Sequence, residues 1–249
     1  MTVDFDNWPY PRWVAHRGAG KLAPENTLAA FRLGAQHGYR MFECDVKLSA
    51  DGTPFLLHDE RLDRTTNGTG MAGALPWAEL HDLDAGSWHS PGFAGEPIAS
   101  FKSLATWIRA NHLLLDVEMK PTAGTEVATG HAVAAACVAL WHGADAPPLI
   151  TSFRPASLQA AMQSAPDLPR GLLVDALWEG WFDMARSLQC VAIVLKHTLV
   201  DAAVVQKAHA ARLRIGVYTP NDVPDVERVQ TAGVDMLVTD AVDIYWPRP

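Results

Sequence analysis

The sequence is poor in cysteine and in positive charge. Its three cysteines, Cys44, Cys137 and Cys190, are too few and too widely spaced for a disulfide framework, and none belongs to a CxxC pair. Acidic residues outnumber basic ones, which gives a formal net charge of −8. A general nucleic-acid or membrane-surface binder needs a basic field, so we expect no nucleic-acid partner.

Long hydrophobic runs are also lacking. No segment approaches the roughly 20 apolar residues of a membrane span. Residues 1–13 carry acids and prolines where a signal peptide needs a basic start and an apolar stretch. We therefore expect a cytoplasmic protein without a membrane anchor, either a monomer or a homodimer. The 249 residues, 49% of them hydrophobic, can bury a large core, and we expect one domain over residues 1–249.

Short apolar runs alternate with segments rich in alanine and leucine, and the latter predict helices near residues 27–37, 104–110, 127–141 and 155–164. Gly38 and Gly143 are expected to follow helix ends. This alternation is typical of a parallel sheet wrapped by helices, an α/β fold, and eight runs predict a single (β/α)8 TIM barrel. The expected strands are residues 13–17, 41–45, 113–118, 149–152, 171–174, 191–195, 215–219 and 235–239.

Residues 54–58 also have strand character, but they follow residues 46–48 too closely for a parallel neighbour, which needs a crossover of about a dozen residues. The intervening Ala50-Asp51-Gly52 is a hairpin signal. We therefore predict that the second strand extends beyond the barrel, reverses at Asp51-Gly52 and returns His58 to the mouth. Residues 59–100 show little helical periodicity and many turn residues, which predicts a small inserted cap over the C-terminal mouth.

Acidic side chains follow two of the expected strands, at the end where barrel enzymes keep their active sites. The period of two places Glu43 and Asp45 on one side of a strand, and Asp116, Glu118 and Lys120 on one side of another. Carboxylates that converge on a barrel mouth repel one another unless a cation lies between them. Oxygen-only ligation favours Mg2+, Ca2+ or Mn2+ over zinc. The alternative is that these acids pair with arginines on the rim.

Two histidines are expected at the same mouth, because His16 ends the first strand and His58 ends the returning hairpin. One can take a proton from a nucleophile while the other protonates the leaving alkoxide of a phosphodiester. Arg17 and Lys120 would face this cavity and bind phosphate oxygens. Three carboxylates, a divalent cation, these two basic groups and a phosphodiester monoanion together carry no net charge. A dianionic product would leave excess negative charge and should bind poorly.

The order and spacing of several short motifs give the sequence a family resemblance. From Trp13 to Asp240 it resembles the glycerophosphodiester phosphodiesterase family of the bacterial cytoplasmic type, most specifically in its first half. The motifs that carry the resemblance are His16-Arg17-Gly18, Pro24-Glu25-Asn26-Thr27, Glu43-Cys44-Asp45-Val46-Lys47-Leu48, Asp51-Gly52, His58-Asp59, Arg64-Thr65-Thr66-Asn67-Gly68 and Glu118-Met119-Lys120.

The resemblance implies a TIM barrel with an insertion after the second histidine. It also implies the cleavage of glycerophosphodiesters into glycerol 3-phosphate and an alcohol, with one divalent cation, Mg2+ or Ca2+, as cofactor. Small soluble diesters such as glycerophosphocholine and glycerophosphoethanolamine are the expected substrates. The site residues that the resemblance implies are the metal ligands Glu43, Asp45 and Glu118, the catalytic histidines His16 and His58, and the phosphate-binding Arg17 and Lys120.

One motif departs from the family. Where family members usually carry Trp-Thr-Val-Asn after a late strand, this chain has Tyr218-Thr219-Pro220-Asn221. Tyrosine keeps an aromatic wall and adds a hydroxyl, whereas Pro220 removes a backbone donor. The departure affects the expected fit of the glycerol moiety or the leaving group more than the phosphate chemistry.

Several polar residues near the expected mouth have both a structural and a functional interpretation. Glu25 and Asn26 open the first helix and also border the expected phosphate position, while Pro24 suits the first helical position. Asp59 either orients His58 or merely begins the insertion. Other side chains are expected mainly in packing or at the surface: the aromatic Trp77, Trp88 and Phe93 of the insertion, the pair Lys196-His197 at another strand end, and the remaining histidines His37, His81, His89, His112, His131, His142 and His209.

The sequence leaves parts of the mechanism open. It does not assign the base and the acid to particular histidines, and it does not distinguish attack by water from attack by the glycerol 2-hydroxyl. Three other functions compete: a lyase that stops at a cyclic phosphate, a metal-dependent sugar isomerase or aldolase, and a non-catalytic phosphate-binding barrel. The sugar enzymes would not need two histidines together with Arg17 and Lys120.

Overall fold

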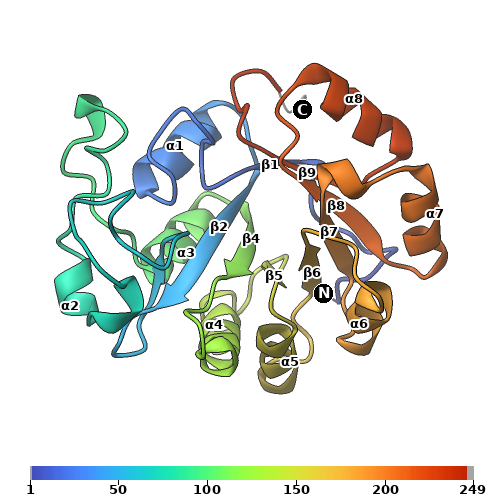
Figure 1. Cartoon of the computed structure of the whole chain (residues 1–249), viewed down its shortest axis with the longest axis horizontal. Helices are drawn as coiled ribbons and strands as arrows, with labels where there is room; N and C mark the ends of the chain where they lie inside the picture. The colour runs from blue at the N-terminus through green and yellow to red at the C-terminus, as the bar shows by residue number, and fades with distance from the viewer. Residues whose placement is uncertain (1, 246–249) are drawn as a thin grey trace.

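Eight parallel strands close a barrel in the computed structural model, which describes residues 2–245. Neighbouring strands follow one another around the ring in chain order, and the last strand pairs with the first. Figure 1 shows the strands at the centre with helices around them. The predicted TIM barrel is confirmed. Its strands are β1 (Trp13–Ala15), β2 (Met41–Leu48), β4 (Leu114–Met119), β5 (Leu149–Ser152), β6 (Arg170–Val174), β7 (Ala192–Lys196), β8 (Arg214–Tyr218) and β9 (Met236–Thr239).

Seven helices connect the barrel strands, and several begin at a side chain that caps the first turn. The Thr27 hydroxyl accepts a hydrogen bond from the backbone N–H of Ala30 at 3.2 Å. Because the first helix begins at Leu28, the prediction that Pro24 occupies its first position is wrong. The connecting helices are α1 (Leu28–Gln36), α3 (Phe101–Ala110), α4 (Glu126–Leu140), α5 (Pro155–Ser164), α6 (Trp181–Ser187), α7 (Ala202–Ala210) and α8 (Val223–Ala232).

The second barrel strand ends in the predicted hairpin. Strand β3 (Pro54–Leu56) pairs antiparallel with the end of β2, where Val46 lies opposite Leu56. Gly52 has a φ of +79°, a left-handed conformation that glycine adopts without steric cost. The hairpin carries the chain back so that His58 lines a cavity at the mouth.

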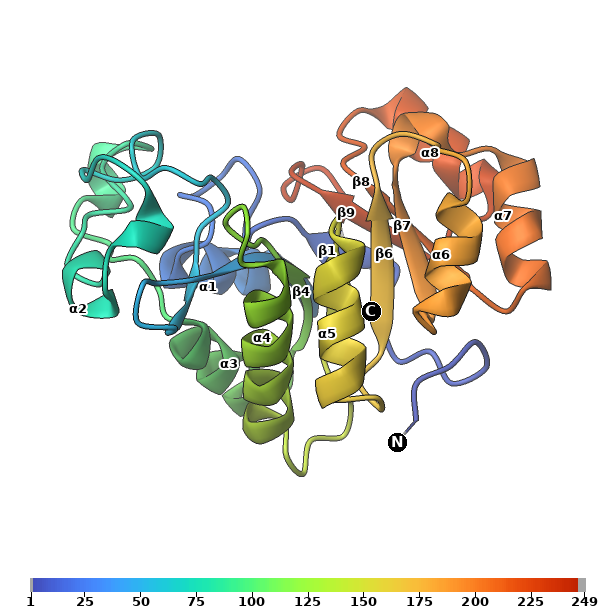
Figure 2. The same ribbon diagram turned by 60° about the horizontal axis from the view of Figure 1, so that its bottom comes forward.

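The insertion, residues 59–100, forms short turns around a small apolar core that also includes Phe55 and Leu57 of the hairpin. Within the described chain it holds the one-turn helix α2 (Trp77–Leu80) and the 3-10 turns η1 (Ala72–Ala74) and η2 (Pro91–Phe93). Figures 1 and 2 place α2 and its neighbouring loops at one side of the barrel, next to α1. Trp77 packs on this core near Phe55, whereas Trp88 is 39% exposed.

The inside of the barrel is layered. Apolar side chains such as Val14, Met41 and Val194 form a cluster that Tyr10 of the N-terminal segment joins. Further along β2 the same inward face carries Glu43 and Asp45, both buried. The layering closes one end of the barrel with apolar packing and leaves polar groups at the C-terminal end, where the loops meet.

Gly34 lets α1 lie close to the loop that carries Arg17. A Cβ at Gly34 would overlap the carbonyl oxygen of Gly18 and lie 2.8 Å from Cε1 of Phe42. Overpacking of this kind costs about 1–3 kcal/mol, so we expect Gly34→Ala to lower the melting temperature by about 2–10 °C. Gly92→Ala is the matched control, because a Cβ there has open space. Equal melting temperatures for the two variants in differential scanning calorimetry would contradict this account of the close approach.

Candidate active site

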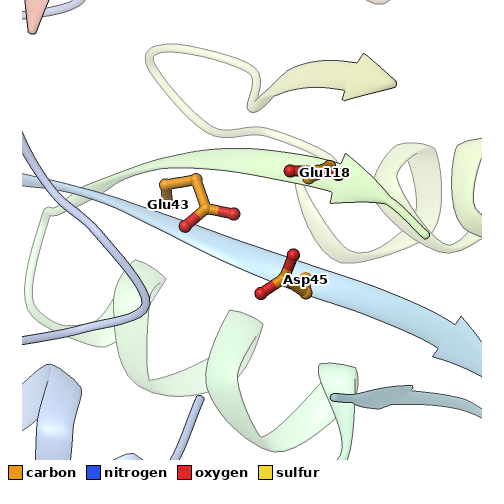
Figure 3. A group of neighbouring side chains, drawn as sticks. All are labelled: Glu43, Asp45 and Glu118. Carbon is orange, nitrogen blue, oxygen red and sulfur yellow. The ribbon is translucent and has the colours of Figure 1, made fainter. Parts of the chain in front are cut away.

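Three carboxylates from two adjacent strands meet at the mouth. Glu43 and Asp45 come from β2 and Glu118 from β4, with Asp45 and Glu118 directly paired in register. Each offers an oxygen that lies within 4.8 Å of the other two. Figure 3 shows the three side chains facing one another between the strands. They are 4%, 1% and 8% exposed respectively, so little water screens their repulsion.

The electrostatics of this acidic group favour a bound cation. Burial, together with repulsion from Asp45 and Glu118, raises the pKa of Glu43 well above its ordinary value. Burial and the Asp45 charge likewise raise the pKa of Glu118 to about 7. One oxygen of Glu43, Oε1, is buried without a hydrogen-bond partner among the described residues. An oxygen-only set with an unpartnered carboxylate oxygen suits a hard divalent ion, so these residues fit a metal site.

Two cations adjoin the acidic group. The Arg17 side chain lies 3.2 Å from Asp45 through its Nε, and its backbone N–H donates to Glu43 Oε2 at 3.0 Å. Lys120 Nζ lies 2.7 Å from Glu118 Oε1 and 3.8 Å from Asp45 Oδ1. Burial opposes the ionisation of Asp45, but Arg17, Lys120 and His58 hold its pKa below the ordinary range. The structure thus brings together the basic and acidic residues that the sequence selected.

The two histidines are oriented in the same way by different carboxylates. His16 Nδ1 lies 2.6 Å from Asp240 Oδ1, and His58 Nδ1 lies 2.6 Å from Asp59 Oδ1. A neutral ring that donates from Nδ1 keeps the lone pair of Nε2 available. His16 Nε2 is 3.8 Å from Glu43 Oε2, and both histidines line one cavity of about 240 Å³.

Burial and nearby charges alter the acidity of His58 and of Asp240, the carboxylate that contacts His16. Burial lowers the pKa of His58; Asp45 opposes this effect, and the cations Arg17 and Lys120 reinforce it. On the other side, burial disfavours the charged form of Asp240, yet its hydrogen bond with His16 helps to hold its pKa at about 2. The Asp240 carboxylate therefore stays ionised at neutral pH.

Two further cavities flank the central one. A cavity of about 400 Å³ shares His58, Glu118 and Lys120 with it and extends to Asp175 and Trp178. On the opposite flank, a cavity of about 420 Å³ is lined by His16 and Arg17 together with Arg64, Trp88 and His89 of the insertion. The catalytic candidates therefore lie between two spaces that can each hold part of a ligand.

The structure resolves several roles that the sequence left open. Asn26 donates to Asp45 Oδ2 at 2.7 Å and accepts from the Asp45 backbone N–H at 3.0 Å, so it fixes a metal-ligand candidate. Glu25 binds Arg17 at 2.9 Å. Asp59 contacts His58 as well as beginning the insertion. His197 instead contacts Asp225 near the start of α8 at 3.4 Å.

Two residues were missed or undervalued in the sequence. Asp240 was not among the residues selected from the sequence. The signal that could have found it is the period of two in β9, because Asp240 lies two residues after the inward-facing Val238. Asn221 donates to Asp240 Oδ2 at 2.9 Å and accepts from its backbone N–H at 2.8 Å. The motif around Pro220 differs from the usual family motif, but it still supplies an asparagine that holds the carboxylate of Asp240 beside His16.

Comparison with known proteins places this site in a family. The sequence model of the glycerophosphoryl diester phosphodiesterase family matches residues 16–244. The chain belongs to this family. A glycerophosphodiester phosphodiesterase of Caldanaerobacter subterraneus subsp. tengcongensis is 32% identical, over 91% of this chain and 93% of that protein.

Solved structures support the same assignment. The chain is 34% identical to an Oleispira antarctica phosphodiesterase in complex with the product sn-glycerol-3-phosphate, with a TM-score of 0.86 and 93% of each chain covered. It is 28% identical to a glycerophosphodiester phosphodiesterase from Agrobacterium tumefaciens, with a TM-score of 0.78 over 94% of this chain and 98% of that one. This member of the glycerophosphoryl diester phosphodiesterase family is accordingly a phosphoric diester hydrolase.

Across residues 2–245 of this family member, no helix combines the length and the apolar character that crossing a membrane requires.

Asp116 lies beneath the acidic group and makes stability depend on pH. Burial raises its pKa from 3.8 to about 8, although Thr151 donates a hydrogen bond to Oδ1 at 2.7 Å. In the unfolded chain this carboxyl ionises near pH 4. The free energy of unfolding therefore decreases as the pH rises from about 4 to about 8. Asp116→Asn keeps the acceptor for Thr151 and removes the titration. In chelator, we expect it to melt at least about 4 °C above wild type at pH 9, with the difference shrinking towards pH 4.

Asp82→Asn serves as the control for this experiment, because the Asp82 side chain is 82% exposed. Its melting temperature should follow that of wild type at every pH. A constant offset between Asp116→Asn and wild type from pH 4 to pH 9 would show that Asp116 does not titrate in this way.

Proposed function

We propose that the chain hydrolyses glycerophosphodiesters to sn-glycerol 3-phosphate and an alcohol, with a divalent cation and two-histidine acid-base catalysis. The arrangement of two histidines around one cavity supports this most directly, because each Nδ1 is held by a carboxylate and Glu43, Glu118 and Lys120 share the cavity. The Oleispira antarctica relative, whose structure contains sn-glycerol-3-phosphate, supports the product.

Glu43, Asp45 and Glu118 would hold one Mg2+ or Ca2+ ion. Such an ion supplies a Lewis acid that polarises a phosphoryl oxygen and offsets the negative charge of the transition state. Asn26 keeps Asp45 in place through two hydrogen bonds, and the backbone N–H of Arg17 donates one hydrogen bond that helps to hold Glu43.

Arg17 and Lys120 would bind the phosphodiester. A guanidinium and an ammonium on either side of Asp45 provide the positive charge that a phosphate anion requires. With the divalent ion and the three carboxylates, these groups balance a phosphodiester monoanion. The phosphomonoester product carries a second negative charge near neutral pH, so release of the product is favoured.

His16 and His58 would carry the two proton transfers. One Nε2 takes the proton of the attacking hydroxyl as the new P–O bond forms, and the other ring protonates the alkoxide as the old P–O bond breaks. Asp240 and Asp59 hold the rings in position at 2.6 Å. The same groups serve attack by water or by the glycerol 2-hydroxyl, and accumulation of a cyclic phosphate would identify the second route.

The flanking cavity on the His58 side would accept the leaving alcohol. It has a volume of about 400 Å³, begins at His58 and Lys120, and reaches Asp175 and Trp178. Trp178 is 42% exposed, which leaves part of its ring free for contact with a ligand. A carboxylate beside an aromatic face suits a cationic amine such as choline or ethanolamine. Glycerophosphodiesters that carry these headgroups are therefore the proposed substrates.

Release of sn-glycerol 3-phosphate from glycerophosphocholine tests the proposal. We expect activity with Mg2+ or Ca2+, loss of activity in chelator, and a decrease of at least about a hundredfold in His16→Ala, the usual scale for loss of an acid-base group. His142→Ala, a variant in the α4–β5 loop, should retain wild-type activity. Tight binding of glycerophosphocholine without turnover would instead support a phosphate-binding barrel.

Asp175→Asn tests the proposed headgroup cavity. Removing one partly solvated charge should raise KM for glycerophosphocholine about three- to tenfold, a change of ~1 kcal/mol, and leave KM for glycerophosphoglycerol within about twofold. Asp183→Asn is the matched control, since its side chain is 83% exposed on α6. Equal KM changes for the cationic and the neutral substrate would assign the alcohol to another cavity.

A further inference from the structure

Arg64 of the insertion binds two carboxylates that reach it from separate parts of the chain. Its Nε and Nη2 donate to Asp59 at 2.6 Å and 3.0 Å. Its Nη1 and Nη2 donate to Glu25 at 2.7 Å and 2.9 Å. The planar guanidinium thus uses two of its edges at once, a geometry that lysine cannot reproduce.

Each of these carboxylates contacts a group of the proposed machinery. Asp59 Oδ1 lies 2.6 Å from His58 Nδ1, and Glu25 Oε1 lies 2.9 Å from Nη1 of Arg17. Nε of Arg17 in turn lies 3.2 Å from Oδ2 of Asp45. An unbroken series of alternating charges therefore runs from a catalytic histidine candidate, through Arg64, to a metal-ligand candidate.

The two histidines differ in how their carboxylates are supported. Asp240 directly follows β9, and Asn221 holds it with two hydrogen bonds from the neighbouring loop after β8. Asp59 lies beyond the hairpin, outside the barrel strands. Besides its contact with His58, its side chain accepts two hydrogen bonds from Arg64. His58 therefore depends on the insertion for its orientation, whereas His16 depends on the barrel.

We propose that Arg64 is a positioning residue that fixes His58 and Arg17 relative to each other through Asp59 and Glu25. The inference rests on the proposed function, because it assigns a consequence to the placement of those two groups. Without the guanidinium, Asp59 and Glu25 would lose their shared partner, and both His58 and Arg17 would gain freedom to move. A displacement of about 1 Å at a reacting group can cost about a hundredfold in rate.

The exposure of Arg64 separates this role from a contribution to stability. Its side chain is 45% exposed, and ion pairs at such positions contribute little to the free energy of unfolding. A loss of catalysis without a loss of stability is therefore the expected signature of Arg64→Ala.

Steady-state kinetics of the metal-loaded enzyme with glycerophosphocholine test the proposal. Arg64→Ala should lower kcat/KM by about 10- to 100-fold, the range for partners that orient functional groups, with a lower kcat and a higher KM. Arg64→Lys should recover only a small part of the loss. Arg61→Ala is the matched control: this arginine of the same insertion pairs with Asp63 and is 59% exposed, and its variant should keep wild-type kinetics. All three variants should melt within about 3 °C of wild type.

Coupling to the two carboxylates provides the second test. In the Asp59→Asn and Glu25→Gln double variant, removing Arg64 should cost less than about threefold, because Arg64 acts through these two residues. The same large loss in both backgrounds would overturn the proposal. So would an Arg64→Ala enzyme whose kcat/KM stays within threefold of wild type.

A crystal structure of Arg64→Ala separates failure of this inference from failure of the proposed function. The expected result is displacement of the His58 ring or the Arg17 guanidinium by about 1 Å or more from their wild-type positions. Unchanged positions of both groups would overturn the positioning role, whatever the wild-type protein hydrolyses. If wild type hydrolysed no glycerophosphodiester but both groups were displaced in the variant, the result would contradict the proposed function and still support the positioning role.

Discussion

Repulsion among Glu43, Asp45 and Glu118 is the constraint around which the mouth of the barrel is organised. Three carboxylates this close and this buried cannot all ionise without compensating positive charge. Arg17 and Lys120 supply part of that charge from the strand ends on either side. The remaining deficit is what makes the group a candidate metal site, and it explains why the cations, the histidines and the cavity gather at this point.

The barrel strands position some of the site residues, and the hairpin and insertion position others. The strands place the acidic group, Lys120 and the Asp240 partner of His16 on rigid, hydrogen-bonded backbone. The hairpin, which pairs with β2, and the insertion together place His58, whose ring contacts Asp59. Arg64 connects the two parts through Glu25, whose loop precedes α1. A site assembled in this way can change its flanking cavities through the insertion while the strands keep the arrangement of the three carboxylates.

The alternation of side chains along each strand made much of the site predictable from sequence. A period of two placed Glu43 with Asp45, and Asp116 with Glu118 and Lys120, and the structure brings these residues to one mouth. The same rule could not rank polar residues at the later strand ends. Asp175, Lys196 and Asp240 all continue an inward face, and only the closure of β9 against β1 shows that Asp240 is the one beside His16.

The sequence by itself determined the barrel, the reversal at Asp51-Gly52 and the identity of the seven site candidates, because periodicity, turn chemistry and short motifs are local properties of the chain. Only the tertiary structure decided which carboxylate orients each histidine, that Glu25 and Asp59 share Arg64, and that cavities lie on both flanks. These facts depend on contacts between residues up to 224 positions apart, such as His16 with Asp240. Barrel closure creates such contacts, and no local pattern encodes them.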